Sequence, residues 1–427
     1  TDISLLINKD FPWTIAPGHW QCNLTAVRRD NMILEPAPID IDMQRLAGRA
    51  KDWRIQTSIT CSESHLSDKN NGLTVENISM ELKGGLEKIE GTGSWSLHGI
   101  PGVLALNFSH NLNTGKGKAA INSKNPFTLS KELPLRAILD RWTLPADLTG
   151  GRLQLHSTIR WQPVKMNLQV ELTEGEGHFK TTRFSGLATR QNIQILPAIQ
   201  SRKTGIVTID KVNAEIPMQN FSTIIRLQPS SHGPLPEIIL KDTRISLFGG
   251  TISDDLLSVD LQKPEIQSRV TLNNIDLPEL INLQQVKGLK VSGKLHGRLP
   301  FRIDKSGLHI DNGRLENMSP GGIIEYNPPG NIGLQQSPFS EYVLKALEEF
   351  HFDLLSATAM YSPDGKLQMN LHLEGKSPKL ETNRPVHLNI NTEQNLLSLL
   401  ESLRYSKSLT DEIDTKVQQH FQNKPSP

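Results

Sequence analysis

Residues 153–159 read Leu153-Gln154-Leu155-His156-Ser157-Thr158-Ile159, and this alternation of apolar and polar side chains decides the fold. Successive side chains of a β-strand point to opposite faces of a sheet, so such a stretch has one apolar and one polar face. The same pattern returns at residues 168–172, 257–261 and 367–373. The sequence therefore predicts a mainly β protein whose strands each bury one face.

Turn-forming residues separate these predicted strands at short intervals. Glycine-containing turns are predicted at residues 83–85, 114–117, 149–151, 248–250, 320–322 and 363–365. Many strands at such spacing indicate an extended antiparallel sheet, a sandwich or a barrel.

Helical spacing of apolar residues is rare and concentrates near the C-terminus. Helices are predicted at residues 340–350, with Ser340 as N-cap, at residues 393–404, and at residues 408–421, which begin with a capping-box pattern. This change of character predicts two regions. Residues 1–337 would form an elongated β region, and residues 338–427 a mixed strand and helix region that continues or caps it.

One internal repeat is visible in the sequence. Leu133-Pro134-Leu135-Arg136-Ala137-Ile138-Leu139 leads to a glycine-bearing strand entry at residues 148–153. Leu277-Pro278-Glu279-Leu280-Ile281-Asn282-Leu283 leads to a similar entry at residues 289–295. Both copies predict a short helical turn after Leu-Pro, which suits an architecture that grows by adding strands to an edge.

The charge balance argues against a nucleic-acid partner. The chain has 427 residues, with 46 basic and 45 acidic side chains and a net charge of +1. A nucleic-acid footprint would require a clustered basic excess. The hydrophobic content of 36% also fits one-sided strands better than a parallel sheet buried on both faces.

The two cysteines, Cys22 and Cys61, leave two interpretations open. In an oxidising compartment they could form one disulfide, and in a reducing compartment they would remain thiols. The sequence contains no run of 18 apolar residues and no signal peptide, and it begins in a strand-like pattern without Met. We therefore expect a soluble portion of a longer protein whose upstream membrane anchor is missing.

The sequence shows no constellation that indicates catalysis, a metal or a cofactor. The 13 histidines are dispersed and form no His-x-His or His-Glu-x-x-His ligand pair. Residues 114–118 lack the first glycine and the Ser or Thr of a phosphate-binding loop, so a hairpin turn is the better interpretation. The sequence thus predicts a protein that is not an enzyme and carries no cofactor and no metal.

The apolar faces of the strands must be covered, because few helices are predicted. Two sheets could cover one another as a sandwich, and alternation alone favours this arrangement. A sheet curled into an open trough would instead present a continuous apolar stripe to acyl chains, at about 0.8 kcal/mol per buried methylene.

Motifs in the C-terminal half favour the trough. Residues 288–300 form a glycine-punctuated strand that ends in Leu299-Pro300, and Asp311-Asn312-Gly313-Arg314-Leu315 and Gly321-Gly322-Ile323-Ile324-Glu325-Tyr326 follow. This order resembles the C-terminal pattern of AsmA-like envelope proteins. Phe248-Gly249-Gly250-Thr251-Ile252 also fits the Gly-Gly-x-Ile strand motif of that group. The later segments at residues 361–367, 373–378, 384–390 and 395–400 are similar in order and spacing to the YdbH branch of that group. The clear resemblance covers about residues 240–405.

The resemblance implies a fold, a location and partners. We expect a mainly β protein with a long, curled, open antiparallel sheet and few short helices. Such proteins lie in the periplasm of Gram-negative bacteria, are anchored in the inner membrane by an N-terminal helix and move phospholipids toward the outer membrane. The YdbH branch is also expected to pair with a small outer-membrane lipoprotein near its C-terminus, which an exposed strand edge could accept by β-augmentation.

The predicted function is thus a passive phospholipid conduit whose apolar strand residues contact acyl chains. The candidate groove residues are Leu153, Leu155, Ile159, Leu168, Val170, Leu172, Ile245, Leu247, Leu257, Val259, Leu261, Met369 and Leu371. The sequence does not decide which alternating set of side chains faces the groove.

Two other functions remain open. One is an envelope scaffold whose apolar faces close into a β-sandwich. The other is a binding module for a glycan or peptide, against which the aromatic content of 5% argues.

Overall fold

The computed structural model describes residues 12–399, except residues 25–26, 30–31, 35–36, 50–51, 68–71, 98–99, 141–144, 215, 264, 284–285, 329–337 and 381–384. Within these residues the chain forms 27 strands and four short helical segments, the last of which covers residues 396–399. The prediction of a mainly β protein with few helices is therefore confirmed. The predicted helix at residues 408–421 lies outside the described residues.

The chain divides into two compact units. Unit 1 contains residues 1–210 and 226–236, and unit 2 contains residues 211–225 and 237–427. This division falls elsewhere than the predicted boundary after residue 337, which rests on the change from strand-like to helical spacing and stays a prediction.

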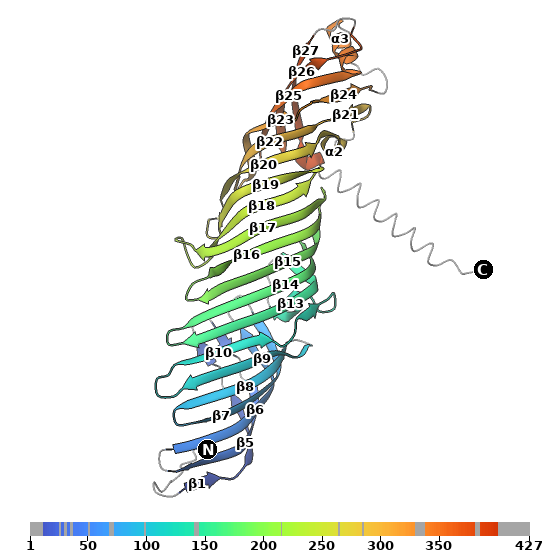
Figure 1. The fold of residues 1–427 in the computed structure, drawn as a ribbon. Helices are drawn as coiled ribbons and strands as arrows, with labels where there is room; N and C mark the ends of the chain where they lie inside the picture. The colour runs from blue at the N-terminus through green and yellow to red at the C-terminus, as the bar shows by residue number, and fades with distance from the viewer. Residues whose placement is uncertain are drawn as a thin grey trace, which may run out of the picture. The chain divides into compact units, whose positions relative to one another are not determined.

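Unit 1 contains an antiparallel sheet whose neighbouring strands largely follow chain order (Figure 1). From β5 the pairing runs β5-β6-β7-β8-β9-β10-β13-β14-β15, with β2 on the other side of β5. The strands that begin in this unit are β1 (Pro12–Ile15), β2 (Gly18–Leu24), β3 (Val27–Arg29), β4 (Met32–Leu34), β5 (Ala37–Arg49), β6 (Asp52–Ser67), β7 (Gly72–Gly85), β8 (Lys88–Leu97), β9 (Ile100–Asn111), β10 (Gly117–Ser123), β11 (Phe127–Leu129), β12 (Leu139–Asp140), β13 (Ala146–Trp161), β14 (Lys165–Phe179), β15 (Thr182–Leu196) and β16 (Gln200–Asn213).

Unit 2 contains antiparallel pairs in the order β18-β19-β20-β22-β23-β25-β26-β27. The remaining strands are β17 (Met218–Pro229), β18 (Pro236–Leu247), β19 (Gly250–Asp260), β20 (Ile266–Asp276), β21 (Leu289–Val291), β22 (Lys294–Asp304), β23 (Gly307–Asn317), β24 (Gly322–Tyr326), β25 (Phe350–Tyr361), β26 (Lys366–Lys376) and β27 (Val386–Asn395). Among the described pairings of either unit, none joins the first strand of the series to the last. The predicted open antiparallel sheet is therefore confirmed.

Both copies of the Leu-Pro repeat form the short helices that the sequence predicts. They are α1 (Leu135–Ile138) and α2 (Leu277–Asn282), and the proline of the second copy occupies the first turn of its helix. Pro is favoured there because the first helical N–H groups have no partner within the helix. Asp147 of β13 holds α1 in place, since its buried carboxylate accepts the Arg136 N–H and forms an ion pair with the Arg136 side chain.

The third helix, α3 (Pro338–Leu347), matches the helix predicted at residues 340–350, but it ends before Phe350, which begins β25. The helix predicted at residues 393–404 begins too early. Residues 393–395 still belong to β27, because Lys366 of β26 pairs with Asn395, and helical backbone starts at Leu396.

Residues with positive φ interrupt the strands in their interiors. Five of them are Glu174, Asn220, Asp242, Asn274 and Asn312, with φ between 51° and 56°. At Glu174, Asn274 and Asn312 the register shifts between paired strands, as it does at a β-bulge. In β14, for example, the buried positions change from even numbers before Glu174, such as Leu172, to odd numbers after it, namely Gly175 and Gly177. A bulge therefore lets one strand keep its apolar residues on one face although the sequence alternation changes phase.

The predicted turn at residues 149–151 is wrong. Gly150 and Gly151 lie inside β13, where the register against β14 shifts on both sides of Gly150. Gly151 has φ of 123°, and a Cβ atom there would lie 2.9 Å from the Cα of Gly175. Glycine is needed at residue 151 because of this positive φ and because the backbones of β13 and β14 approach each other closely there.

The disulfide between Cys22 and Cys61, which the sequence left open, is not formed. Cys22 of β2 pairs with Ile39 of β5, and the next residue, Asp40, pairs with Thr60 of β6. The two cysteines thus lie on strands separated by β5, at about twice the strand spacing of roughly 4.8 Å. This separation exceeds the Cα distance that a disulfide can bridge.

Candidate functional site

A row of cross-strand partners crosses unit 1 and is apolar nearly throughout. Paired residues of neighbouring strands lie on the same face of a sheet, so the row defines a single face. We call it the unit 1 apolar row, and its members in order of pairing are Trp20, Ile41, Ile59, Met80, Gly93, Leu106, Ile121, Ser157, Leu168 and Ile193.

The adjacent row, on the opposite face, is polar except for one alanine. Its members in the same order are His19, Asp42, Ser58, Glu81, Thr92, Asn107, Ala120, Thr158, Asn167 and Gln194. The sheet of unit 1 therefore has one apolar face and one polar face from β2 to β15.

Unit 2 is built in the same way. Its apolar row consists of Ile245, Ile252, Leu272, Gly297, Leu315, Ala357, Leu371 and Ile390. The adjacent row on the other face consists of Arg244, Ser253, Thr271, Arg298, Arg314, Thr358, Asn370 and Asn391. Strand register thus assigns a face to each alternating set, which the sequence could not do.

The predicted groove residues of unit 1 all lie on its apolar face. Leu168 belongs to the apolar row, and the other five flank it at alternate positions of β13 and β14. They are Leu153, Leu155, Ile159, Val170 and Leu172. Leu153 pairs with Leu172 and Leu155 with Val170, so these side chains are neighbours across the two strands.

In unit 2, four of the predicted residues lie on the apolar face. Ile245 and Leu371 belong to the apolar row, while Leu247 and Met369 lie two positions from them and pair with Gly250 and Ala359. Leu257 and Val259 pair with Leu240 and Ile238, but they lie five and seven positions from Ile252 on β19, so alternation does not place them on the face of the apolar row. Leu261 differs, because it follows the end of β19 and is 40% exposed. The sequence analysis did not select Phe301, Ile303 and Ile310 as groove residues. They also occupy alternate positions of β22 and β23, so the same apolar alternation could have identified them.

The apolar face is closed at one end of the strands and only half-buried farther along. In unit 1 a buried cluster that includes Phe127, Leu129 and Ile138 covers Leu153 and Leu172. In unit 2, Leu277 of α2 and Phe350 belong to the buried cluster that contains Leu295 and Leu373. Away from these clusters, Ile159, Leu168, Ile245, Leu247 and Met369 are half-buried. The face thus offers apolar area that the described residues do not fully cover.

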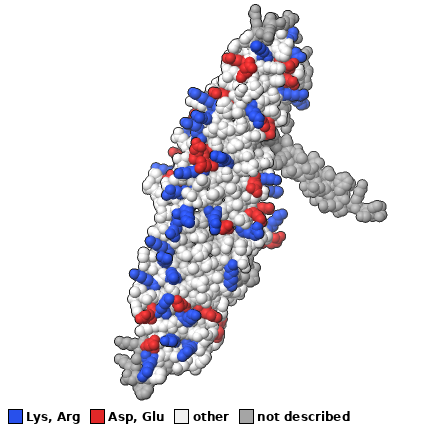
Figure 2. Space-filling view, in the orientation of Figure 1, with Lys and Arg blue, Asp and Glu red and all other residues white. Residues whose placement is uncertain are grey.

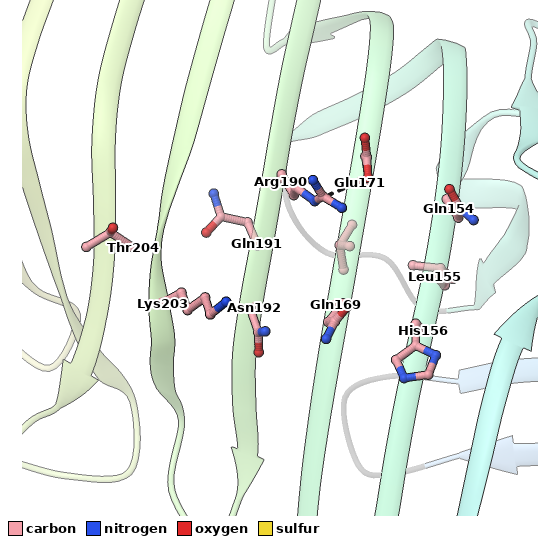
Figure 3. Close-up of a pocket in the computed structure, with 11 residues that line it drawn as sticks. Gln154, Leu155, His156, Gln169, Glu171, Arg190, Gln191, Asn192, Lys203 and Thr204 are labelled. Atoms are coloured by element: carbon pink, nitrogen blue, oxygen red, sulfur yellow. Dashed lines mark ion pairs between the residues drawn. The ribbon is translucent and has the colours of Figure 1, made fainter.

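A hollow of about 480 Å³ lies against β13, β14, β15 and β16 in unit 1 (Figure 3). Most of its lining side chains belong to the polar face: Gln154, His156, Gln169, Glu171, Arg190 and Asn192. Arg190 forms an ion pair with Glu171 at 3.4 Å. Leu155 and Val170, two of the predicted groove residues, also border the hollow, so residues of both alternating sets of these strands line it.

Charged side chains of both signs are interspersed on the face drawn in Figure 2, with broad uncharged areas between them. This distribution agrees with the net charge of +1 and with the expectation of no nucleic-acid partner, which stays a prediction. Among the described residues, no helix is long and apolar enough to cross a membrane.

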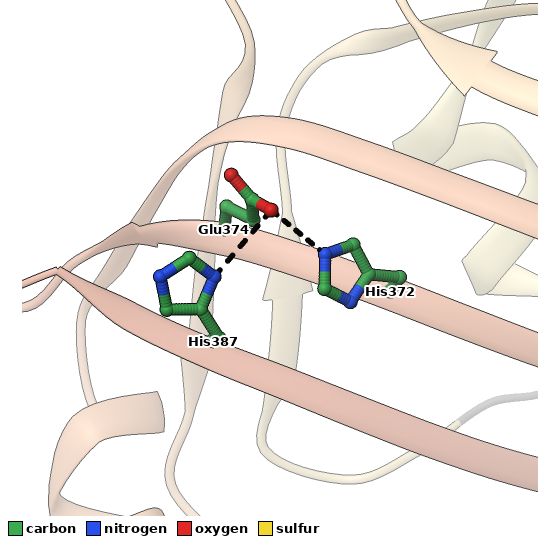
Figure 4. A group of neighbouring side chains, drawn as sticks. All are labelled: His372, Glu374 and His387. Carbon is green, nitrogen blue, oxygen red and sulfur yellow. Dashed lines mark hydrogen bonds and ion pairs between the residues drawn. The ribbon is translucent and has the colours of Figure 1, made fainter.

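One cluster of ligand-type side chains lies on the polar face of unit 2. His372, Glu374 and His387 meet across β26 and β27 (Figure 4). The Glu374 carboxylate accepts a hydrogen bond from His372, which raises the pKa of His372 and lowers that of Glu374. The sequence search missed this group because His387 comes from a neighbouring strand rather than from a local motif.

The fold and the face define the class, which is a β-sheet protein that displays a long apolar surface on an open antiparallel sheet. The chain belongs to the YdbH-like family, whose description is "Intermembrane phospholipid transport protein YdbH" and whose family model matches residues 5–418.

A curated relative agrees with this family. It is the "Probable phospholipid transport protein YdbH" of Escherichia coli (strain K12), 22% identical over 172 residues. The matched part is 40% of this chain and spans 19% of the relative's length. No solved structure matches the chain.

Proposed function

We propose that the apolar face of each unit binds phospholipid acyl chains and that the chain works as a non-enzymatic conduit between inner and outer membrane. The observation that supports this is that cross-strand partners in each unit form an apolar row opposite a polar row, and that Leu168, Ile245 and Leu371 of the predicted groove residues are members of these apolar rows. The YdbH-like family and its description support this proposal.

Acyl chains suit the apolar face for a physical reason. Each methylene that moves from water onto this face gains about 0.8 kcal/mol, and this gain does not depend on the position along a uniform apolar row. A lipid could therefore move from strand to strand without meeting a position that binds it much more strongly than the others, while its headgroup stays in water. No bond is made or broken in such movement.

The rival function is an envelope scaffold with a closed sandwich core. A closed sandwich would bury the inward side chains of its strands, because the two inner faces interdigitate. Leu168 and Ile193 of unit 1, and Ile245 and Leu371 of unit 2, are instead half-buried among the described residues. Their exposure favours the conduit.

The partners and the location belong to the same proposal. We infer a periplasmic protein of a Gram-negative bacterium with an inner-membrane anchor upstream of this sequence.

Among the described pairings, β27 pairs with β26 on one side only. We propose that its other edge accepts a strand of a small outer-membrane lipoprotein. Hydrogen exchange tests this, because the backbone amides of β27 should exchange more slowly when that lipoprotein is added.

Leu168 and Gln169 provide a matched pair of variants for the conduit. Both lie on β14, Leu168 in the apolar row and Gln169 on the polar face. We expect Leu168→Asp to abolish co-purification of phospholipid, because a carboxylate on the acyl path must be desolvated. Gln169→Asp should keep the lipid. Native mass spectrometry with lipid extraction measures both, and circular dichroism checks that both variants fold.

Equal lipid content in the two folded variants would contradict the conduit. A folded wild-type chain that neither co-purifies with phospholipid nor takes it up would favour the scaffold.

A further inference from the structure

Three side chains with metal-binding atoms converge on the polar face of β26 and β27. His372 and Glu374 occupy alternate positions of β26, and His387 is the cross-strand partner of Glu374 (Figure 4). The intervening residue, Leu373, is 1% exposed and points to the apolar core. The cluster is therefore separated by the sheet from the proposed lipid-binding face.

The distances within the cluster match a coordination polyhedron. The Glu374 Oε1 atom lies 2.9 Å from His372 Nε2 and 3.4 Å from His387 Nδ1. All three ligand atoms lie within 4.8 Å of one another. In a tetrahedral zinc site with bonds of about 2.0–2.1 Å, neighbouring ligand atoms are roughly 3.3 Å apart. A cation at their centre therefore requires only small side-chain rotations.

A fourth residue orients the first histidine. Asn389, the cross-strand partner of His372, places its side-chain oxygen 2.7 Å from His372 Nδ1. When Nδ1–H donates to this oxygen and Nε2 carries no proton, the Nε2 lone pair faces the Glu374 carboxylate. A proton on Nε2 satisfies this pair in the absence of a metal, and a bound cation would replace that proton. Metal-binding histidines use this kind of hydrogen bond from the remote nitrogen to fix their tautomer.

We propose that His372 Nε2, His387 Nδ1 and Glu374 bind a divalent zinc-type cation, with Asn389 as the positioning residue for His372. Two imidazoles and one carboxylate are a donor set that zinc accepts with a fourth position open to water or another ligand. Imidazole nitrogen selects Zn²⁺ over Mg²⁺ and Ca²⁺, which prefer oxygen ligands. The bound ion would fasten β27 to β26.

The test is Zn²⁺ titration of the purified chain in competition with a chromophoric chelator, together with Co²⁺ absorption spectroscopy. We expect one equivalent of Zn²⁺ and a tetrahedral Co²⁺ spectrum for the wild-type chain. His387→Ala and Glu374→Gln should each weaken binding at least tenfold. The matched control is His296→Ala, because His296 faces the single carboxylate of Glu316 at 3.7 Å. This variant should bind as the wild type does.

Thermal unfolding separates binding from folding. In EDTA the variants and the wild type should unfold at similar temperatures, because His372, Glu374 and His387 are all partly exposed. Excess Zn²⁺ should raise the unfolding temperature of the wild type and not that of His387→Ala, since a ligand stabilises only the state that binds it. Unchanged Zn²⁺ affinity in His387→Ala, or a wild type without stoichiometric Zn²⁺, would overturn the proposal. Neither result would affect the lipid-binding face.

Discussion

At the residue scale, the positions with positive φ explain where sequence reasoning lost the correct face. Val270 and Leu272 alternate as expected, but the next core residue of β20 is Ile275, one position out of phase. A strict period of two would place Ile275 on the polar face, yet its side chain is 1% exposed. Asn274, with φ of 56°, supplies the extra residue between them. Alternation therefore predicted the strands, and only the register showed how each strand keeps one apolar face.

Asn274 is the position for testing this role. Asn274→Val should destabilise the chain by about 1–2 kcal/mol, because a β-branched side chain is strained at positive φ. Asn274→Gly should be nearly neutral or stabilising, since glycine adopts this conformation freely. Urea unfolding followed by circular dichroism measures both. Equal stability of the two variants would show that Asn274 does not need this backbone conformation.

Asp304 carries a pH dependence that also belongs to single residues. Its carboxylate accepts hydrogen bonds from the Ser306 hydroxyl at 2.5 Å and the Ser306 N–H at 2.8 Å, and Arg302 lies beside it, so its pKa is held well below the usual range. A lowered pKa stabilises the fold above the unfolded-state pKa of about 3.9, and this contribution is lost as the pH falls. Asp304→Asn should therefore lower the unfolding temperature at pH 7. The difference from the wild type should shrink below about pH 4, and a difference that stays constant down to pH 2 would contradict this role.

At the element scale, the short helices were largely predictable, because their signals are local. Leu-Pro followed by apolar residues marked α1 and α2, and apolar residues at helical spacing marked α3. The predicted N-cap was wrong, because α3 begins at Pro338 and Ser340 lies inside it. What the helices cover was not predictable, because Phe350 and Leu373 meet through strand pairing and tertiary packing. These contacts close one end of the apolar face in unit 2 and leave the rest half-buried.

Leu373 and Leu371 test this difference between the closed end and the half-buried remainder. Both lie on the apolar face of β26, but Leu373 is 1% exposed whereas Leu371 is half-buried. Leu373→Ala should cost about 2–5 kcal/mol, because it leaves a cavity in a close-packed cluster. Leu371→Ala should cost clearly less and should weaken lipid binding instead. Denaturant midpoints and lipid content measure the two effects, and a larger stability loss for Leu371→Ala would contradict this assignment.

At the scale of the whole molecule, the fold class was predictable because alternation and glycine turns extend along most of the chain. The choice between a sandwich and an open sheet was not, since both produce the same alternation. The resemblance at residues 240–405 favoured the open sheet, and the strand pairings within each unit confirm it. The rows of cross-strand partners then give both units the same design, an apolar face opposite a polar one.

The measurement that tests the central claim most directly is site-specific photo-crosslinking in cells. A photoreactive amino acid would replace Leu168 or Met369 on the apolar face, and its neighbour Gln169 or Asn370 on the polar face. We predict phospholipid adducts at Leu168 and Met369 and none at Gln169 and Asn370. Adducts at both faces alike, or at neither apolar position, would contradict the claim that acyl chains lie on the apolar face.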